Sequence, residues 1–458
     1  MCRNDEGSRK RRIMTTPIVD FVNKYMEAGF ARFHMPGHKG KAFLGPEPYD
    51  ITEIDGADVL YSAGGIINES ENNVSALFDT AHTFYSAEGS TLAIKAMLFL
   101  ATLGAHGDGK PLIFAARNAH KAFIYGASML DMDVEWLYPD GEAHLCACRI
   151  SADILEQKLA GAQKKPCAVY ITSPDYLGNE ADIGSLARVC KKFDIPLLVD
   201  NAHGAYLNFL SPSRHPMALG ATACADSAHK TLPVLTGGAY LHISKDAPKE
   251  FCENARHALS LFASTSPSYV ILQSLDLCNR YIADGYKERL HDTIARVDTI
   301  KAELSALGFA PEESEPLKIV VRAASYGYRG TDIGEVLRTH GAEAEFCDDE
   351  YIVLMVTPEN TENDTEKLLS AFRSISPKAA LETEQISLER ARAVMPLRAA
   401  MLAPQELISA NDAVGRICAS PTVACPPAVP IVISGEVITS RAARLFERYG
   451  IEKIAVVK

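Results

Sequence analysis

The sequence predicts an α/β fold, in which a large, mostly parallel sheet is followed by a smaller α+β region and a C-terminal region. Between residues 111 and 199, short apolar runs alternate with helical patterns. The runs are continuously apolar, as in parallel strands that are buried on both faces. Because 458 residues are too many for one compact core, two or three domains are expected.

Each element of the sheet region follows from its own local pattern. Short apolar runs predict strands, and helices are expected where apolar residues recur every three or four positions. Ser151 is a suitable N-cap for one of these helices. The expected strands are 112–116, 134–138, 167–172 and 195–199, and the expected helices are 118–130, 151–162 and 183–193.

The part before the sheet is expected to be mainly helical. In residues 17–30, Ile18, Val22 and Met26 fall on one helical face, which predicts a docking helix. Residues 68–84 are also expected to form a helix. A Gly-Ser-Thr turn then opens a strongly apolar helix within 88–100.

The periodicity changes beyond residue 255, where longer helical stretches precede the smaller α+β region. The expected elements are helical stretches through 279 and from 284 to 307, a strand at 317–322, a helix at 331–340, a hairpin at 343–356, and helices at 363–374 and 388–401, with a last helix and strand. A polar linker is expected near 376–385. The predicted division is an N-terminal tail, helix and loop segment (1–60), a large domain (61–300), a small domain (301–376) and a C-terminal domain (377–458).

Composition and charge exclude several classes of protein. A net charge of −12 argues against a nucleic-acid partner and is compatible with a cationic small substrate. No run of about 18 apolar residues predicts a membrane span, and the basic first residues lack the apolar core of a secretory signal. We therefore expect a cytoplasmic protein. The four carboxylates of residues 50–60 indicate a solvated turn, so no metal is expected.

Polar residues follow the predicted strands. Asp200 and His203 come after the strand at 195–199, and His120 follows the strand at 112–116. Ligands of parallel sheets bind at the carboxyl ends of the strands. A lone histidine is more often a structural group that caps the sheet, and the alternative for His120 is a ring stacked on a flat ligand.

Lys230 is the candidate covalent centre. It follows Ser227 and His229 in a short polar loop, where desolvation and neighbouring cations lower the pKa of an amine and let it form an imine with an aldehyde. Alone, a His-Lys pair is usually a surface feature. Ser90 and Thr91 begin a helix, where they are either a simple N-cap or, with the unpaired backbone amides, a seat for phosphate.

Taken together, these residues match what pyridoxal 5′-phosphate requires. The aldehyde needs a lysine, and the phosphate needs hydroxyls at a helix start. The pyridine nitrogen stays protonated only beside a buried carboxylate, which Asp200 supplies.

The chain resembles the ornithine/lysine/arginine decarboxylase family, which has the aspartate-aminotransferase fold (fold type I). The motifs that carry the resemblance are FHMPGHKG, DITEIDGAD, EGST, RNAHK, VDNAHGAY, DSAHKTLPVLT and CPPAVPIVISGE, in family order over nearly the whole chain. It is similar to the short form, which lacks an N-terminal receiver-like wing domain.

The resemblance implies roles for individual residues. Lys230 would be the Schiff-base lysine, Asp200 the pyridinium partner and His120 the ring that stacks on the cofactor. The residues implied around the phosphate are Ser90, Thr91, Ser227 and His229, and His203 is implied near the cofactor. Either Lys230 or His229 would protonate the substrate carbon after carbon dioxide leaves.

The resemblance also implies the reaction, the substrate and the assembly. The reaction would be decarboxylation of arginine, lysine or ornithine to the corresponding polyamine-pathway amine. The protein would form a homodimer or a larger homo-oligomer whose active sites are shared between subunits, with the HMPGHKG loop nearby. Candidates to bind the distal cation of the substrate are Glu436, Glu53 and Asp55.

Three departures from the family pattern leave the substrate open. Gly237 stands where many members have Gln, Asn201 stands in VDNAH, and residues 424–430 alter the tail motif. Two alternatives remain. One is another fold type I reaction, either aldol cleavage or transamination with Arg322 or Arg329 holding the α-carboxylate. The other is a non-catalytic regulator with this fold.

Overall fold

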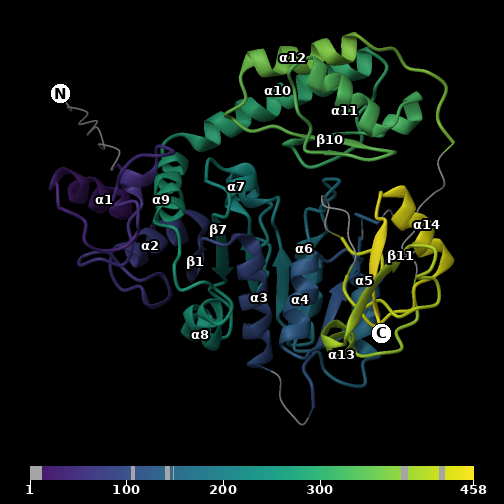
Figure 1. The fold of residues 1–458 in the computed structure, drawn as a ribbon, viewed down its shortest axis with the longest axis horizontal. Helices are drawn as coiled ribbons and strands as arrows, with labels where there is room; N and C mark the ends of the chain where they lie inside the picture. The colour runs from purple at the N-terminus through teal and green to yellow at the C-terminus, as the bar shows by residue number, and fades with distance from the viewer. Residues whose placement is uncertain (1–12, 105–108, 140–144, 148, 383–389, 422–428) are drawn as a thin grey trace, which may run out of the picture.

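A seven-stranded sheet forms the centre of the computed structural model, which describes residues 13–104, 109–139, 145–147, 149–382, 390–421 and 429–458 (Figure 1). The strands are β1 (His82–Ser86), β2 (Leu112–Ala116), β3 (Asp133–Leu137), β4 (Ala168–Thr172), β5 (Leu197–Asp200), β6 (Ala223–Asp226) and β7 (Ala239–Ile243). Their order in the sheet is β1-β7-β6-β5-β4-β2-β3. The neighbours from β3 to β6 pair in parallel, and β7 is antiparallel to both β1 and β6. The sheet is therefore mostly parallel, with one reversed strand.

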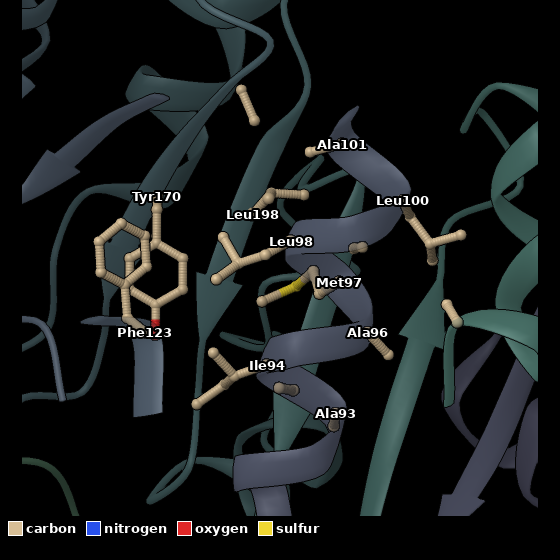
Figure 2. Close-up of a cluster of buried hydrophobic side chains, with 14 of the residues drawn as sticks. Ala93, Ile94, Ala96, Met97, Leu98, Leu100, Ala101, Phe123, Tyr170 and Leu198 are labelled. Atoms are coloured by element: carbon tan, nitrogen blue, oxygen red, sulfur yellow. The ribbon is translucent and has the colours of Figure 1, made fainter. Parts of the chain in front are cut away.

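Helices cover both faces of this sheet, as the continuously apolar strands predict. Ile113 and Ala115 of β2 face α3 (Gly89–Thr102), α4 (Lys121–Met129) and α8 (Lys249–Ser260). Phe114 and Ala116 point the other way, toward α5 (Ala152–Ala160) and α6 (Ile183–Lys192). Figure 2 shows the first core, where the apolar α3 lies against the sheet. Nearby, the rings of Phe123 and Tyr170 pack with centroids 4.4 Å apart.

A helical layer at the N-terminal end packs beside β1. It consists of α1 (Pro17–Glu27), α2 (Ile66–Phe78) and α9 (Tyr269–Ala283), with two single-turn 3-10 helices, η1 (Glu47–Tyr49) and η2 (Leu60–Ser62). Ile18 and Val22 of α1 are fully buried. The backbone N–H groups of Ile18 and Val19 donate to the carboxylate of Asp276 in α9, at 2.9 and 3.0 Å. Asp276 thus satisfies amides at the start of α1 that no turn of the helix can bond.

A second, three-stranded sheet lies over the strand ends of the first (Figure 1). The strands of this sheet are β8 (Lys318–Val321), β9 (Phe346–Cys347) and β10 (Ile352–Met355). The helices of the same region are α10 (Tyr286–Ala306), η4 (Ala323–Tyr326), α11 (Gly330–Thr339) and α12 (Glu362–Arg373). The buried Lys318 ammonium pairs with Glu315 at 3.0 Å and donates to the carbonyls of Asp175 and Tyr176 at 3.2 and 3.3 Å. These bonds fasten the second sheet to the loop that follows β4.

The C-terminal part contains α13 (Leu397–Leu402), α14 (Ser440–Arg448) and an antiparallel pair, β11 (Gln405–Ser409) with β12 (Lys453–Val457). Arg117, which is 1% exposed at the end of β2, ties this part to the large sheet. Its guanidinium donates to the carbonyls of Pro430 and Ile431 at 2.8 and 3.0 Å. Within the described ranges, no helix combines the length and apolar character needed to cross a membrane.

Two helix predictions are corrected. The helix expected at 68–84 ends at Phe78, because Asp79 takes a left-handed conformation (φ 55°). The aromatic and β-branched residues after it form β1, which pairs with β7. Of the helix expected at 388–401, the structure describes 390–401, and there helix is found only from Leu397 on, in Leu397–Leu402, which begins after Pro396. Residues 1–12, 383–389 of the expected linker and helix, and 424–428 of the altered tail motif lie outside the described residues. The boundaries between the four expected domains stay predictions.

Candidate active site

A cavity of about 210 Å³ opens at the carboxyl ends of the parallel strands. Thr172 and Asp200, the last residues of β4 and β5, both line it. Five of the residues expected at the site line this one cavity, namely Ser90, His120, Asp200, His203 and Lys230. The structure thus brings together groups that are up to 140 positions apart in the chain, from Ser90 to Lys230.

Lys230 lies in α7 (Ala228–Thr231), the single helical turn that follows β6. Its Nζ is 3.0 Å from Nε2 of His203. Burial, together with the neighbouring charge of Lys230, holds the pKa of His203 well below its usual range. His203 is therefore neutral and accepts a hydrogen bond from Lys230 at Nε2. In that tautomer Nδ1 carries the proton, yet this buried nitrogen has no hydrogen-bond partner among the described residues.

Asp200 is 2% exposed at the end of β5. One carboxylate oxygen accepts from the Tyr170 hydroxyl at 3.0 Å, and the other accepts from the Ala202 amide at 3.2 Å. Burial raises the pKa of Asp200, although Tyr170 and Lys230 oppose the shift. A buried carboxylate of this kind is stabilised by a cationic partner.

His120 caps α4, where its Nδ1 accepts from the amide of Ala122 at 3.1 Å. Burial, and then the charges of Lys230 and Lys121, lower the pKa of His120 to about 4. The ring is therefore neutral near pH 7 while it lines the cavity. The capping role and a place beside a flat ligand are compatible, since capping uses one edge of the ring.

The start of α3 meets the lysine loop through a pair of hydroxyls. Ser227 donates to Ser90 at 2.8 Å, and the amide of Gly89 donates to the Gly237 carbonyl at 2.7 Å. Thr91 lies in the same helical turn, and His229 makes a 3.0 Å bond between Nδ1 and the Gly238 carbonyl. Of these residues, only Ser90 lines the cavity in the described part of the chain.

The glycine at 237 has a steric cause. Its φ is +100°, and a Cβ there would lie 3.0 Å from the Ala87 carbonyl oxygen. The loop after Lys230 passes so close to the turn before α3 that it excludes a glutamine, the residue that many members of the resembled family have at this position. Gly237 is therefore required by the backbone path of this loop, which also holds Ser227 beside Ser90.

The three carboxylates expected to bind the substrate do not line the cavity. Glu53 and Asp55 are exposed on the surface. Glu436 is buried, accepts from the Ile433 amide at 2.8 Å and lies 3.9 Å from Arg117. In the described chain it serves to hold the C-terminal part against the end of β2.

Tyr176 and Glu345 are among the residues of the cavity wall that sequence reasoning missed. The Tyr176 ring stands edge-on to the His203 ring, with centroids 5.2 Å apart, and its hydroxyl donates to Glu345 at 2.7 Å. The place of Tyr176 just after a strand was a usable signal. The sequence holds no such signal for Glu345, because this residue lines the cavity from the second sheet.

The residues present fit the cofactor that the sequence suggests. A planar ring with a protonated nitrogen would satisfy the buried Asp200 carboxylate. A polar atom on that ring could accept the unpaired Nδ1 proton of His203. The hydroxyls of Ser90 and Ser227 at the start of α3 suit a phosphate.

Known proteins resemble this chain over most of its length. Residues 16–321 match the family model described as Orn/Lys/Arg decarboxylase, major domain. The arginine decarboxylase of Bacillus subtilis is 28% identical over 457 residues, covering 93% of this chain and 91% of the relative.

Solved structures share the fold. The lysine decarboxylase of Francisella novicida superposes with a TM-score of 0.80 at 17% identity, covering 98% of this chain and 82% of the other. The constitutive lysine decarboxylase of Escherichia coli gives a TM-score of 0.75 at 16% identity, covering 97% and 82%. The fold type I architecture expected from the sequence is confirmed.

Proposed function

The chain belongs to the Orn/Lys/Arg decarboxylase family and is a decarboxylase, and on that premise we propose that it removes the α-carboxylate of arginine, lysine or ornithine with pyridoxal 5′-phosphate as cofactor. The observation that carries the proposal is the meeting of Lys230 and Asp200 in one cavity. The product would be the corresponding polyamine-pathway amine.

Each residue expected at the cofactor site has a proposed task in holding the cofactor. Lys230 would bind the aldehyde covalently, Asp200 would pair with the ring nitrogen, and His120 would lie against the ring. His203 would donate from Nδ1 to a polar ring substituent. The phosphate would be held by Ser90 and Ser227 at the start of α3, with Thr91 and His229 adjacent. When bound, pyridoxal phosphate supplies an electron sink for the bond that breaks as carbon dioxide leaves.

The chain itself then governs charge and proton movement. Asp200 remains ionised because its partner is cationic, which offsets the burial that raises its pKa. Neutral His203 accepts a hydrogen bond from Lys230, with 3.0 Å between Nζ and Nε2, and so positions the amine. We assign to Lys230 the delivery of the proton that replaces carbon dioxide on the substrate carbon. Lys230 lines the cavity, whereas His229 is bonded to the Gly238 carbonyl.

Transamination is less well supported than decarboxylation. Aminotransferases hold the α-carboxylate with an arginine of the smaller domain. Arg322 pairs with Glu350 at 3.1 Å and Arg329 precedes α11. Neither arginine lines the cavity in the described chain.

An assay of the purified protein with pyridoxal phosphate and arginine, lysine or ornithine tests the proposed reaction. We expect carbon dioxide and one amine from at least one substrate, and no product from the Lys230→Ala variant. Formation of a keto acid instead would favour an aminotransferase. Cofactor absorbance with no turnover would favour the non-catalytic regulator.

We also propose a homodimer or a larger homo-oligomer with shared active sites. The loop between α1 and η1 exposes large apolar side chains, with Phe33 at 96%, Phe43 at 78% and Leu44 at 91% exposure. Apolar surface gathered on one loop is typical of an interface. A second copy that covers this loop would also bring Glu53 and Asp55 near an interface. A cytoplasmic location stays a prediction.

A further inference from the structure

We propose that Tyr170 is a positioning residue that acts on the cofactor through Asp200, an inference that rests on the proposed function. The Tyr170 hydroxyl holds the Asp200 carboxylate and keeps the proton that this carboxylate shares with the ring nitrogen on the nitrogen. Among the described residues Tyr170 is not part of the cavity wall, whereas Asp200 is. Its effect on the cofactor therefore passes through Asp200.

The sheet places Tyr170 directly behind Asp200. Tyr170 in β4 pairs in register with Leu198 in β5, and both side chains belong to the core between the sheet, α3 and α4. Asp200 comes two residues after Leu198, so its side chain points to the same face of the sheet. The tyrosine is long enough to reach this diagonal neighbour, and its hydroxyl donates to the carboxylate oxygen Oδ2 at 3.0 Å.

Packing fixes the position of this hydroxyl, and burial fixes its protonation. The Tyr170 ring is fully buried and lies against Phe123 with centroids 4.4 Å apart (Figure 2). Burial, and then the charge of Asp200, raise the pKa of Tyr170 well above its usual range. The hydroxyl therefore keeps its proton near neutral pH and acts as a donor to the carboxylate.

The donors to Asp200 leave its negative charge available to a cation. In the part of the chain that the structure describes, these donors are the Tyr170 hydroxyl on Oδ2 and the Ala202 amide on Oδ1, the latter at 3.2 Å. Both donors are uncharged. Since a carboxylate offers about four lone-pair positions, two of them remain for a further donor. A protonated ring nitrogen suits this buried anion.

The bond from Tyr170 decides where a shared proton lies. A hydrogen bond donated to a carboxylate stabilises its ionised form and so lowers its affinity for a proton. When the same carboxylate faces a pyridine nitrogen, the balance shifts toward the protonated ring. The protonated ring is the stronger electron sink for the bond that breaks as carbon dioxide leaves. Tyr170 thus supports the reaction without touching the cofactor.

The test compares two buried tyrosines that each donate to a carboxylate. Tyr170→Phe removes the hydroxyl and keeps the aromatic ring. Tyr206→Phe is the matched control, because Tyr206 is fully buried, donates to Glu315 at 2.7 Å and does not line the cavity. Each protein is loaded with pyridoxal phosphate that is isotopically labelled at the ring nitrogen. NMR reports the protonation of this nitrogen, and kcat and KM are measured with the preferred basic amino acid.

Loss of one charge-assisted bond should raise the affinity of Asp200 for the shared proton by about 10- to 100-fold. In Tyr170→Phe the nitrogen signal should therefore move toward that of the unprotonated ring. Its kcat should fall by up to about 100-fold, with KM little changed. Tyr206→Phe should keep the wild-type signal and kcat. An unchanged nitrogen signal in Tyr170→Phe would overturn the inference, whatever the effect on kcat.

A measurement on the wild-type protein keeps the inference testable if Tyr170→Phe does not fold. The ring nitrogen should stay protonated from about pH 6 to about pH 9, because the raised pKa of Tyr170 keeps the donor intact over this range. Loss of the nitrogen proton within this range would overturn the inference.

Failure of the proposed function is distinguishable from failure of this inference. If the wild-type protein releases no carbon dioxide from arginine, lysine or ornithine, the proposed function fails. The nitrogen signal of the bound cofactor still decides the role of Tyr170 in that case. A protein that binds no pyridoxal phosphate would refute both.

Discussion

At the scale of single residues, burial keeps the two imidazoles of the cavity neutral and raises the pKa of Asp200. The pKa of His203 is held well below its usual range and that of His120 falls to about 4, in both cases mainly through burial. Both histidines are therefore hydrogen-bonding groups near pH 7. Lys230 and the substrate are left as the sources of mobile protons.

The depressed pKa of His120 predicts a pH dependence of stability. Between about pH 6.5 and about pH 4 the unfolded chain binds a proton at this residue and the folded chain does not, so the free energy of unfolding falls as the pH falls. His120→Asn keeps a capping side chain without the titration. It should remove up to about 3 kcal/mol of the loss between pH 7 and pH 4 in urea unfolding.

The matched control is His291→Asn, because the side chain of His291 is 85% exposed. It should leave the slope of stability against pH unchanged. If His120→Asn and the wild-type protein lose stability in parallel, the low pKa assigned to His120 is wrong.

At the scale of elements, a buried network centred on Asp226 holds the lysine loop in place. Asp226 ends β6 and accepts from His215 at 2.9 Å, from His242 at 3.1 Å and from Asn201 at 2.7 Å. Burial favours the protonated acid, but the two histidines hold the pKa of Asp226 well below its usual range. Since Ser227 follows directly, this network anchors the start of α7.

Removing this carboxylate should destabilise the protein strongly. Asp226→Asn removes the buried charge and leaves one acceptor oxygen for the three donors Asn201, His215 and His242, so we expect a loss of about 3–5 kcal/mol in urea unfolding. The exposed Asp246 gives the control, and Asp246→Asn should change stability by less than about 0.5 kcal/mol. A loss below about 1 kcal/mol in Asp226→Asn would mean that the network does not anchor the loop.

The elements also mark where sequence reasoning succeeded. Continuous apolar runs located β2, β4 and β5, because strands buried on both faces leave a strong pattern, whereas the edge strand β3 (DVEWL) was located although only Leu137 in it is buried. The pattern failed at 68–84, where β1 follows a helix that stops at Asp79, and at 388–401, where Pro396 delays the helix. The local hydrophobic pattern reveals neither the left-handed conformation of Asp79 nor the pairing of β1 with β7.

The residues of the candidate site likewise fall into those that the sequence predicts and those that only the tertiary structure reveals. Asp200, His120 and His203 lie at or just after the ends of predicted strands, so the sequence predicts a common place at one edge of the sheet, whereas β6, which precedes Lys230, is not among the predicted strands. Glu345 lines the cavity because the second sheet lies over the strand ends of the first. Glu436 lies beside Arg117 because the C-terminal part packs against the end of β2. Contacts between separate sheets depend on tertiary packing, which no local pattern reports.

At the scale of the whole molecule, the exposed apolar loop predicts assembly. Burial of Phe43 and Leu44 against a second copy would remove two side chains, 78% and 91% exposed, from water. The double substitution Phe43→Ser and Leu44→Ser should shift the molar mass measured by light scattering toward the monomer. Leu402→Ser is the control, since Leu402 is 67% exposed on α13, far along the chain. A wild-type protein that is monomeric at micromolar concentration would contradict the proposed assembly.

The central claim is that Lys230 and Asp200 hold one cofactor between them, and its most direct test is the mass of a peptide. The protein is loaded with pyridoxal phosphate, reduced with borohydride to fix any imine, digested and analysed by mass spectrometry. The account predicts one cofactor per chain, attached to Lys230, and weaker loading in Asp200→Asn. Attachment to a different lysine, or equal loading of the Asp200→Asn variant, would contradict it.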